Sequence, residues 1–154
     1  MKAVVIHAAK DLRIEDREPA PVGIGEVEVA IEAGGICGSD LHYYNHGGFG
    51  AIRLREPMIL GHEIAGTIVA MGEGVTGYDI GDSAVILPAV TCGTCYFCLR
   101  DLEQFCTDTV TFGYNIDGGL AEYVLVPAKA VAQGNLITTR TEVKPTHLAL
   151  AEPL

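Results

Sequence analysis

The chain has 154 residues, 49% hydrophobic and 19% charged, a composition that suits one globular domain with an apolar core and argues against disorder. Ten Lys and Arg face twenty Asp and Glu, and the formal net charge of −10 argues against nucleic acid or an anionic membrane as a partner. Residues 1–16 carry charges where a signal peptide is apolar, and no run approaches the roughly 18 apolar residues of a spanning helix, so we expect a soluble, cytoplasmic protein.

Short runs rich in β-branched residues, separated by glycines and prolines, predict strands along most of the chain. In chain order they are KAVVIHA (2–8), EVEVAIEA (26–33), EIAGTIVAM (63–71), SAVILPAV (83–90) and AEYVLVPA (121–128). EVEVAIEA alternates acidic and apolar residues, which is the period-two pattern of a strand with one solvated face. The pattern predicts a mainly β fold, either a barrel or a sandwich.

Helical signals are few. SDLHYY (39–44) could form one turn capped by Ser39 or Asp40, and CYFCLRDLEQF (95–105) could form another. A third begins at PTHLALAEPL (145–154), where Pro145 occupies a position near the helix start that proline favours.

Gly72, Gly74 and Gly77 in GEGVTG match the G-x-G-x-x-G pattern of dinucleotide-binding loops. A dinucleotide loop must open a long helix whose N-terminus faces the pyrophosphate, whereas YDIGDSAVILPAV follows here. We interpret GEGVTG as a glycine-rich turn between strands and assign no cofactor-binding residue.

Four of the five cysteines lie close together in CGTCYFCLRDLEQFC (92–106), with two residues between successive members of the first three. This spacing lets a tight turn direct thiolates to one ion, and four thiolates saturate a tetrahedral zinc. A redox CxxC or inert thiols are the alternatives, while disulfides are disfavoured in a reducing compartment. A closed site would leave no position for a substrate. The predicted ligands of this structural zinc are Cys92, Cys95, Cys98 and Cys106.

The fifth cysteine, Cys37, belongs to a second constellation, because His62 and Glu63 follow it in GHE. Cys37, His62 and a carboxylate would give zinc three mixed ligands and leave a fourth position open, as a catalytic site requires. The alternative is that Cys37 and His62 are ordinary core residues.

Five segments together resemble the zinc-dependent medium-chain alcohol and polyol dehydrogenases, closest to the L-idonate 5-dehydrogenase and sorbitol dehydrogenase branch. They are GGICGSDLHYY, PMILGHEIAGTIVAMGEGVTGYDIGD, the four-cysteine run, DGGLAEYVLVP and LALAEPL. The resemblance implies a mainly β, GroES-like barrel over residues 1–154, with a few short helices and a structural zinc lobe at 88–112. It also implies that the chain ends before the α/β Rossmann domain that binds the dinucleotide.

By this resemblance the intact parent protein oxidises a secondary alcohol in a polyol or sugar acid with NAD or NADP, and the chain alone is inactive. Two zinc ions per chain are implied, one catalytic and one structural, and the parent is implied to be a homo-oligomer. Cys37, His62, Glu63 and Glu152 correspond to the residues around the catalytic zinc. Ser39 and His42 correspond to the catalytic proton relay, although Ser39 is equally explained as a helix cap.

Several other residues have two interpretations. Asp40 either orients His62 or serves as a cap or solvated carboxylate. Tyr43, Tyr44 and Phe112 line a substrate pocket or belong to the core. Arg53 in RLRE meets an anionic sugar acid or lies in a solvated loop. These candidates stay open at the level of sequence.

Three alternatives to the polyol reading remain. One is an L-threonine dehydrogenase-like member of the same family. Another is a zinc-stapled β module that binds a partner and has no enzymatic activity. The last is a zinc-independent reductase of the quinone oxidoreductase type, which the presence of all five cysteines and His62 disfavours.

Overall fold

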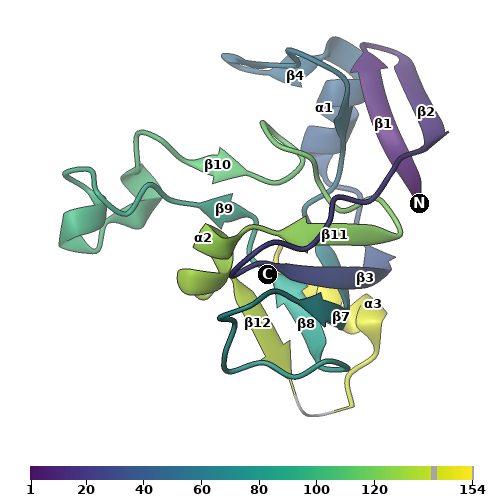
Figure 1. Cartoon of the computed structure of the whole chain (residues 1–154). Coiled ribbons are helices and arrows are strands. Elements are labelled where there is room, and N and C mark those ends of the chain that lie inside the picture. Colours follow the sequence, from purple (N-terminus) through teal and green to yellow (C-terminus); the bar gives the residue numbers. More distant parts are fainter. Residues whose placement is uncertain (140–141, 154) are drawn as a thin grey trace.

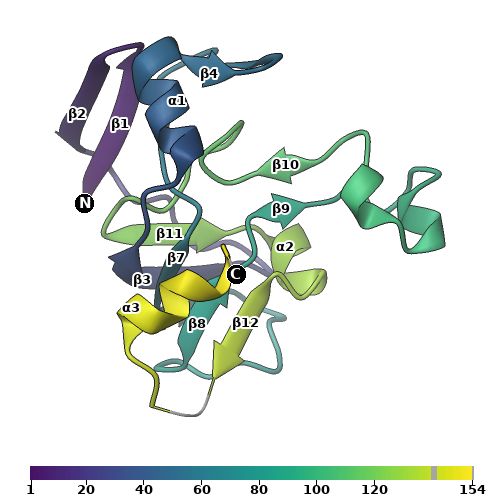
Figure 2. The ribbon, with the colours of Figure 1, turned by 180° about the vertical axis from the view of Figure 1, so that it is seen from behind.

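The computed structural model describes residues 1–139 and 142–153, which form antiparallel sheets with a few short helices (Figures 1 and 2). The strands are β1 (Lys2–Ala8), β2 (Asp11–Asp16), β3 (Val27–Gly34), β4 (Gly48–Phe49), β5 (Ile52–Arg53), β6 (Met58–Ile59), β7 (Ile64–Met71), β8 (Ser83–Ile86), β9 (Ala89–Val90), β10 (Val110–Thr111), β11 (Tyr123–Val126) and β12 (Leu136–Thr139). The helices are α1 (Gly38–His46), α2 (Ala128–Ala132) and α3 (Pro145–Leu148), with 3₁₀ turns η1 (Cys98–Arg100), η2 (Glu103–Phe105) and η3 (Ala149–Ala151). Within the described part of the chain, no helix has the length and apolar character needed to cross a membrane.

The largest sheet has five strands in the order β11-β3-β7-β8-β12, and a second sheet has the order β2-β1-β6. Every strand pair in both sheets is antiparallel. The sheets are joined near the start of β11, where Ala3 bridges Ala121 and the Val4 N–H donates to the Leu120 carbonyl oxygen at 2.8 Å. The mainly β fold predicted from the sequence is therefore confirmed.

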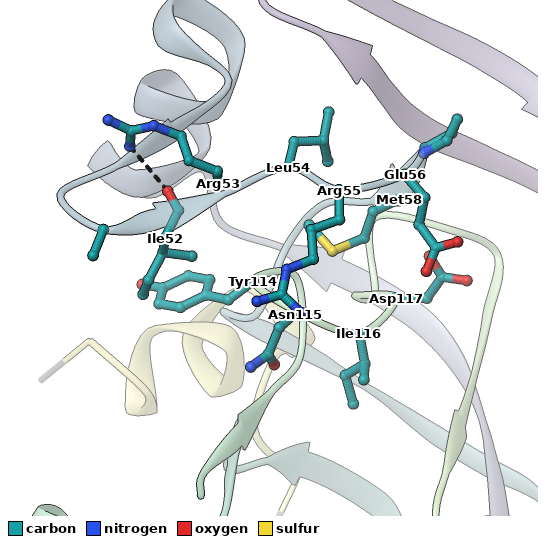
Figure 3. A pocket seen from close by; sticks show the side chains of 12 residues that line it. Ile52, Arg53, Leu54, Arg55, Glu56, Met58, Tyr114, Asn115, Ile116 and Asp117 are labelled. Carbon is teal, nitrogen blue, oxygen red and sulfur yellow. Dashed lines mark hydrogen bonds between the residues drawn. The ribbon is translucent and has the colours of Figure 1, made fainter. Parts of the chain in front are cut away.

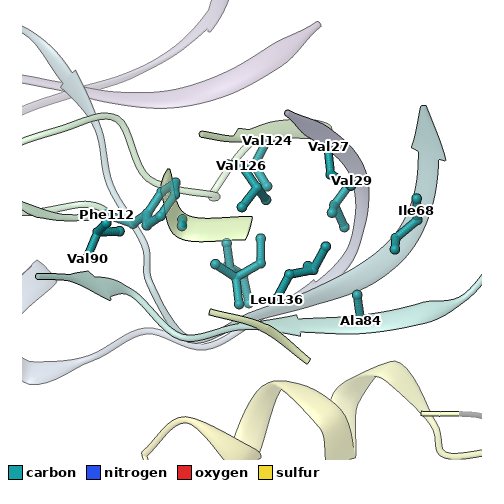
Figure 4. Close-up of a cluster of buried hydrophobic side chains, with 12 residues drawn as sticks. Val27, Val29, Ile68, Ala84, Val90, Phe112, Val124, Val126 and Leu136 are labelled. Carbon is teal, nitrogen blue, oxygen red and sulfur yellow. The ribbon is translucent and has the colours of Figure 1, made fainter. Parts of the chain in front are cut away.

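The main apolar core is built on the five-stranded sheet (Figure 4). Its members are buried side chains from β3, β7, β8, β9, β11, β12 and α2, together with Phe112, which is 1% exposed. A smaller cluster holds α1 against β1 and β6 through Tyr43, Ile6, Met58 and Leu60. Tyr43 and Phe112 are thus core residues, as the second of their two interpretations held.

Most predicted strands form where the pattern places them, with one division. SAVILPAV is split into β8 and β9 at Leu87 and Pro88, because Pro88 has no N–H for a ladder. The Asn135 side chain stabilises the break by donating hydrogen bonds to the carbonyl oxygens of Leu87 at 2.9 Å and Ala89 at 2.7 Å. In β3 the alternation is confirmed, since Val27 and Val29 are fully buried and Glu32 is exposed.

The predicted helices form with different boundaries. The expected cap of the first helix is wrong, because Cys37 rather than Ser39 or Asp40 is its N-cap. The CYFCLRDLEQF segment contains η1 and η2 instead of one helical turn, and Pro145 begins α3. The last residue of that third segment, Leu154, lies outside the described residues. The GEGVTG segment forms the predicted turn between β7 and β8, with positive φ at Gly74 and Gly77 and no helix after it.

Candidate metal centres and the adjoining cavity

Cys37, His62 and Glu63 meet on one side of the core, and their candidate ligand atoms all lie within 4.8 Å of one another. Cys37 stands at the start of α1, whereas His62 and Glu63 lie in the connection from β6 to β7. A thiol, an imidazole and a carboxylate form a mixed S, N and O donor set that suits zinc. The structure therefore brings together three of the four residues that the resemblance implied for the catalytic metal.

Glycines allow these segments to approach one another. A Cβ at Gly35 would lie 2.0 Å from a Glu63 carboxylate oxygen, so a larger residue there would displace that carboxylate from its present position. Gly61, directly before His62, has φ +96, and a Cβ at Gly118 would lie 2.2 Å from the Gly61 carbonyl oxygen. Backbone contact between the turn at Gly61 and the loop at Gly118 thus fixes the start of the His62 segment.

The buried polar atoms of the site fit a bound cation. His62 is 4% exposed, and its Nδ1 atom is buried without a hydrogen-bond partner. A buried imidazole nitrogen normally either binds a metal ion or forms a hydrogen bond, for example with a supporting carboxylate. The donor set and this orphaned nitrogen are therefore compatible with the zinc that the family implies.

Asp40 supports the site from within α1. Its Oδ2 atom accepts a hydrogen bond from the Cys37 backbone N–H at 2.8 Å, while its Oδ1 atom is buried without a partner. Burial raises the pKa of the Asp40 carboxyl, and the Cys37 N–H and the charge of His62 oppose that rise. Asp40 is 4% exposed, which rules out the solvated-carboxylate interpretation, and its hydrogen bond with Cys37 gives it a capping role at the helix start, near His62.

Glu152 approaches the site from the segment after η3. Burial raises its pKa, the charge of His62 opposes the rise, and the neighbouring charge of Glu63 adds to it. Its carboxylate does not belong to the group whose ligand atoms lie within 4.8 Å of one another. Of the two candidate carboxylates, Glu63 is therefore the one placed with Cys37 and His62.

Ser39 and His42 occupy successive turns of α1. The Ser39 Oγ atom is buried and makes no hydrogen bond of normal geometry, whereas His42 is exposed with its ring 6.1 Å from that of His46. The pair therefore runs from the buried start of the helix toward solvent. Cys37 is the N-cap, so Ser39 does not have the capping role that the sequence allowed.

Tyr114 was not singled out in the sequence and proves to be part of the site. Its ring packs edge to face on the His62 ring, with centroids 4.9 Å apart. Burial raises the pKa of the Tyr114 phenol, the adjacent Ser39 hydroxyl lowers it, and the charges of Cys37, Asp40 and Glu152 raise it further. The sequence signal was weak, because FGYNIDGG lies 52 residues from His62 and only the glycines around it suggest a close approach.

The four remaining cysteines form a second cluster whose sulfur atoms also lie within 4.8 Å of one another. The pairing of β9 with β10 closes the base of their segment, which extends away from the main body (Figure 1). The Cys95 and Cys98 sulfurs are 3.5 Å apart, and those of Cys92 and Cys98 are 3.9 Å apart. Zn–S bonds of about 2.3 Å in a tetrahedron place sulfurs about 3.8 Å apart, so the cluster fits zinc.

The environment of these thiols is uneven. Hydrogen bonding from the Cys98 backbone N–H lowers the pKa of Cys95 to about 6, whereas burial raises the pKa of Cys98 to about 11. The backbone N–H groups of Cys92 and Cys95 also donate to sulfur, each at 3.2 Å. Amide donors aimed at sulfur favour thiolates, the form that ligates metal.

A cavity of about 820 Å³, shown in Figure 3, shares Tyr114 with the Cys37 site, although none of Cys37, His62 and Glu63 lines it. Arg53, Arg55, Met58, Tyr114, Asn115 and Asp117 are among its lining residues, and Tyr114 links it to His62. Its size falls in the range of small-molecule sites. Tyr44, the remaining aromatic candidate, does not line it; that ring lies under Lys10, whose Nζ atom is 4.7 Å from the ring centroid.

Comparison with known proteins agrees with the geometry. An L-threonine 3-dehydrogenase of Pyrococcus furiosus is 37% identical over all of this chain and 42% of its own length. A sorbitol dehydrogenase of Bacillus subtilis is 38% identical over 80% of this chain and 35% of its own. The crystal structure of L-idonate 5-dehydrogenase from Escherichia coli K-12 matches with a TM-score of 0.87 and 30% identity over 99% of this chain and 43% of that one.

The chain thus spans about two fifths of the length of the relatives that it matches. The family model of the alcohol dehydrogenase GroES-like domain matches residues 23–135, which include both candidate metal centres apart from Glu152. The resemblance read from the sequence is confirmed. The chain belongs to the family of alcohol dehydrogenase GroES-like domains.

Proposed function

We propose that this chain forms the metal-binding and alcohol-binding part of a zinc-dependent dehydrogenase that oxidises a secondary alcohol with NAD or NADP. The observation that carries the proposal is the grouping of Cys37, His62 and Glu63 beside a cavity, apart from the saturated four-cysteine cluster. A site with three protein ligands keeps a position open for substrate, whereas four thiolates do not. The related dehydrogenases support the alcohol oxidation.

Cys37, His62 and Glu63 would hold the catalytic zinc, with Glu152 as a nearby carboxylate. When bound, zinc favours the deprotonated form of an alcohol at neutral pH. Asp40 holds the Cys37 backbone and places a carboxyl group near His62, and the Tyr114 ring packs edge to face against the His62 ring. These contacts fix the two ligands before the substrate arrives, which limits reorganisation in the reaction.

The substrate proton would leave through Ser39 and His42. This is supported by the buried Ser39 hydroxyl next to Tyr114 and by the exposed His42 one turn later on the same helix. An imidazole titrates near neutrality and can release the proton to water. The hydride acceptor, a nicotinamide, would be presented by a dinucleotide-binding domain of the whole protein, since the described residues include no such fold.

The four-cysteine cluster would bind a second, structural zinc.

The substrate of the whole protein would be a polyol or a sugar acid, the class suggested by the segments around Cys37 and His62. The names of the relatives include sorbitol and L-idonate dehydrogenases, which agree with this class, and an L-threonine dehydrogenase, which keeps an amino-acid alcohol open as the second candidate.

A metal count tests the proposal. We expect two zinc ions per purified chain by mass spectrometry of the metal, and we expect Cys37→Ala to lose one while its circular dichroism stays unchanged. Cobalt substitution distinguishes the sites, because Cys37→Ala should remove the weaker one-thiolate charge-transfer band and keep the strong band of the four-thiolate site. A single zinc that Cys37→Ala leaves in place would favour a zinc-stapled binding module instead.

A further inference from the structure

The cavity beside the Cys37 site contains an arginine without a partner. Arg13 and Arg17 pair with carboxylates, Arg53 donates to the Ile52 carbonyl oxygen, and Arg100 donates to the Tyr96 carbonyl oxygen. Arg55, among the residues that the structure describes, has neither a hydrogen-bond nor an ion-pair partner. Arg55 is exposed, so its unpaired guanidinium is accessible to a ligand in the cavity.

The two neighbouring arginines differ in direction. In Figure 3 the Arg53 side chain turns back onto its own strand, where its Nη1 atom donates to the Ile52 carbonyl oxygen at 3.1 Å. The Arg55 side chain instead extends toward Tyr114 and Asn115. Arg53 was the candidate from the sequence for contact with an anionic sugar acid, but the geometry favours Arg55.

The backbone around Arg55 is held on both sides. Leu54 packs on the Ile6 and Tyr43 cluster, and its N–H donates to the Gly47 carbonyl oxygen at 2.9 Å. Met58, four residues after Leu54, is buried in the same cluster and lines the cavity. Arg55 is thus carried on a short segment that is anchored at both ends, which lowers the cost of ordering its side chain around a ligand.

Two carboxylates also line the cavity, and neither neutralises Arg55. Figure 3 places the Glu56 and Asp117 side chains together, on the side away from the Arg55 guanidinium. Asp117 is engaged with the backbone, since its Oδ1 atom accepts the Ile59 N–H at 2.8 Å. The Arg55 guanidinium lies instead on the side of Tyr114 and Asn115, whose amide oxygen already accepts the Thr111 N–H.

We propose that Arg55 binds the anionic group of the substrate, a carboxylate or a phosphate, while a hydroxyl of the same molecule lies at the Cys37, His62 and Glu63 site. The proposal rests on the function proposed above and narrows its substrate class to anionic hydroxy compounds. Tyr114 connects the two ends, because it lines the cavity and packs on His62. A guanidinium offers paired N–H donors that match either anion.

Binding of matched ligands to the zinc-loaded chain tests this assignment. The ligands are D-gluconate, D-sorbitol 6-phosphate and neutral D-sorbitol, titrated in separate NMR experiments at the same ionic strength. We expect at least one anion to bind about tenfold more tightly than D-sorbitol, as a charge-assisted hydrogen bond predicts. Which anion responds decides between a carboxylate and a phosphate.

Arg55→Gln should weaken binding of the preferred anion about tenfold and leave D-sorbitol binding unchanged. Arg53→Gln is the matched control, because it removes the same charge at a position two residues from Arg55. The Arg53 side chain turns back onto its own strand, so this variant should bind anions like the original chain. Equal losses in the two variants, an unchanged affinity in Arg55→Gln, or equal binding of neutral and anionic ligands would each overturn the proposal. Arg53 and Arg55 are both exposed, so we expect both variants to fold, and circular dichroism checks this.

The metal content of Cys37→Ala, taken together with anion binding by Arg55→Gln, separates this inference from the proposed function. If that variant keeps both metals, the proposed catalytic site is wrong, whether or not Arg55 binds an anion. If it loses one metal and Arg55→Gln has no effect on anion binding, the proposed function stands and the role of Arg55 is wrong.

Discussion

The Asp40 carboxylate and the Cys37 backbone N–H form a 2.8 Å hydrogen bond at the first turn of α1. Cys37 is therefore both the N-cap of a helix and a member of the candidate metal site. Because Asp40 is at the third position of the same helix, a single carboxylate fixes the helix start and contributes negative charge next to His62. The structure of the helix terminus and the geometry of the site are thus coupled.

This coupling predicts different results for two substitutions of Asp40. Asp40→Ala leaves the Cys37 N–H without its acceptor, so we expect a loss of about 1–3 kcal/mol in the free energy of unfolding. It should also weaken zinc binding roughly 10- to 100-fold, the usual effect of removing a supporting carboxylate. Chemical denaturation and competition with a chelator measure the two quantities.

Asp40→Asn is the control, because its amide oxygen can still accept from Cys37 while the charge is lost. We expect it to recover most of the stability and to keep the weaker zinc binding. Equal zinc affinity in Asp40→Asn and the original chain would show that the charge of Asp40 has no part in the site.

Removal of metal should affect the cysteine segment and spare the main core. Among the described residues, the β9–β10 pair alone joins residues 92–106 to the rest by strand hydrogen bonds, and Val90 and Phe112 connect these strands to the main cluster. The four thiols have no other cross-links, since all five cysteines are free. After treatment with a chelator we expect amides of residues 92–106 to lose hydrogen-exchange protection and amides of β3 and β7 to retain it. Loss of protection throughout the chain would contradict this separation.

The contact between Gly118 and Gly61 predicts a sharp dependence on glycine. A Cβ at position 118 would lie 2.2 Å from the Gly61 carbonyl oxygen and 2.6 Å from that of Leu60, and backbone cannot move aside as a flexible side chain can. Gly118→Ala should therefore cost about 1–3 kcal/mol of stability and weaken zinc binding through displacement of His62.

Gly38→Ala provides the matched comparison. A Cβ at Gly38 meets nothing within 4 Å, and the residue is the first of α1, directly beside Cys37. Alanine is the better helix former, so this variant should be as stable as the original chain or more stable. If thermal melting places the two variants together, the close approach at Gly61 does not constrain the site.

How far the sequence predicted this molecule depended on whether the signal was local. The alternation around Val27 and Val29 predicted β3 well, because burial of one sheet face imposes a period of two. By contrast β2, with the sequence DLRIED, is largely exposed and was missed. DLRIED does alternate Leu12 and Ile14 with charged residues, but both apolar side chains are exposed, so pairing with β1 rather than burial of one face holds this strand.

The site shows the same division. Residue types made Cys37 and His62 candidate ligands and the family resemblance favoured them, while the four-cysteine spacing predicted the second cluster. Tyr114 and Arg55 could not be found in this way, because their roles depend on contacts across the fold: an aromatic ring against His62, and a side chain direction that differs between Arg53 and Arg55. Both roles follow from tertiary packing, which residue types and spacing do not show.

The acidic residues of β2 predict a pH dependence confined to the β1–β2 pair. Hydrogen bonding from Arg13 lowers the pKa of Asp11, hydrogen bonding with His7 lowers that of Glu15, and hydrogen bonding from Lys2 lowers that of Asp16. Because each folded pKa lies below its unfolded value, the stabilisation is complete above the ordinary values of 3.8 and 4.5. It is lost as the pH falls through the lower folded values.

Hydrogen-exchange protection factors should therefore stay constant in β1 and β2 from neutral pH to about pH 5 and fall below it, relative to those of β3 and β7. Lys2→Gln removes one partner, the 2.7 Å ion pair with Asp16, and should reduce the acid-dependent loss without removing it, since the Asp11 and Glu15 pairs remain. These pairs are exposed to solvent, so added salt should reduce the dependence further. A uniform loss of protection across both sheets would mean that acid acts on the fold as a whole, and the three carboxylates would then have no local role.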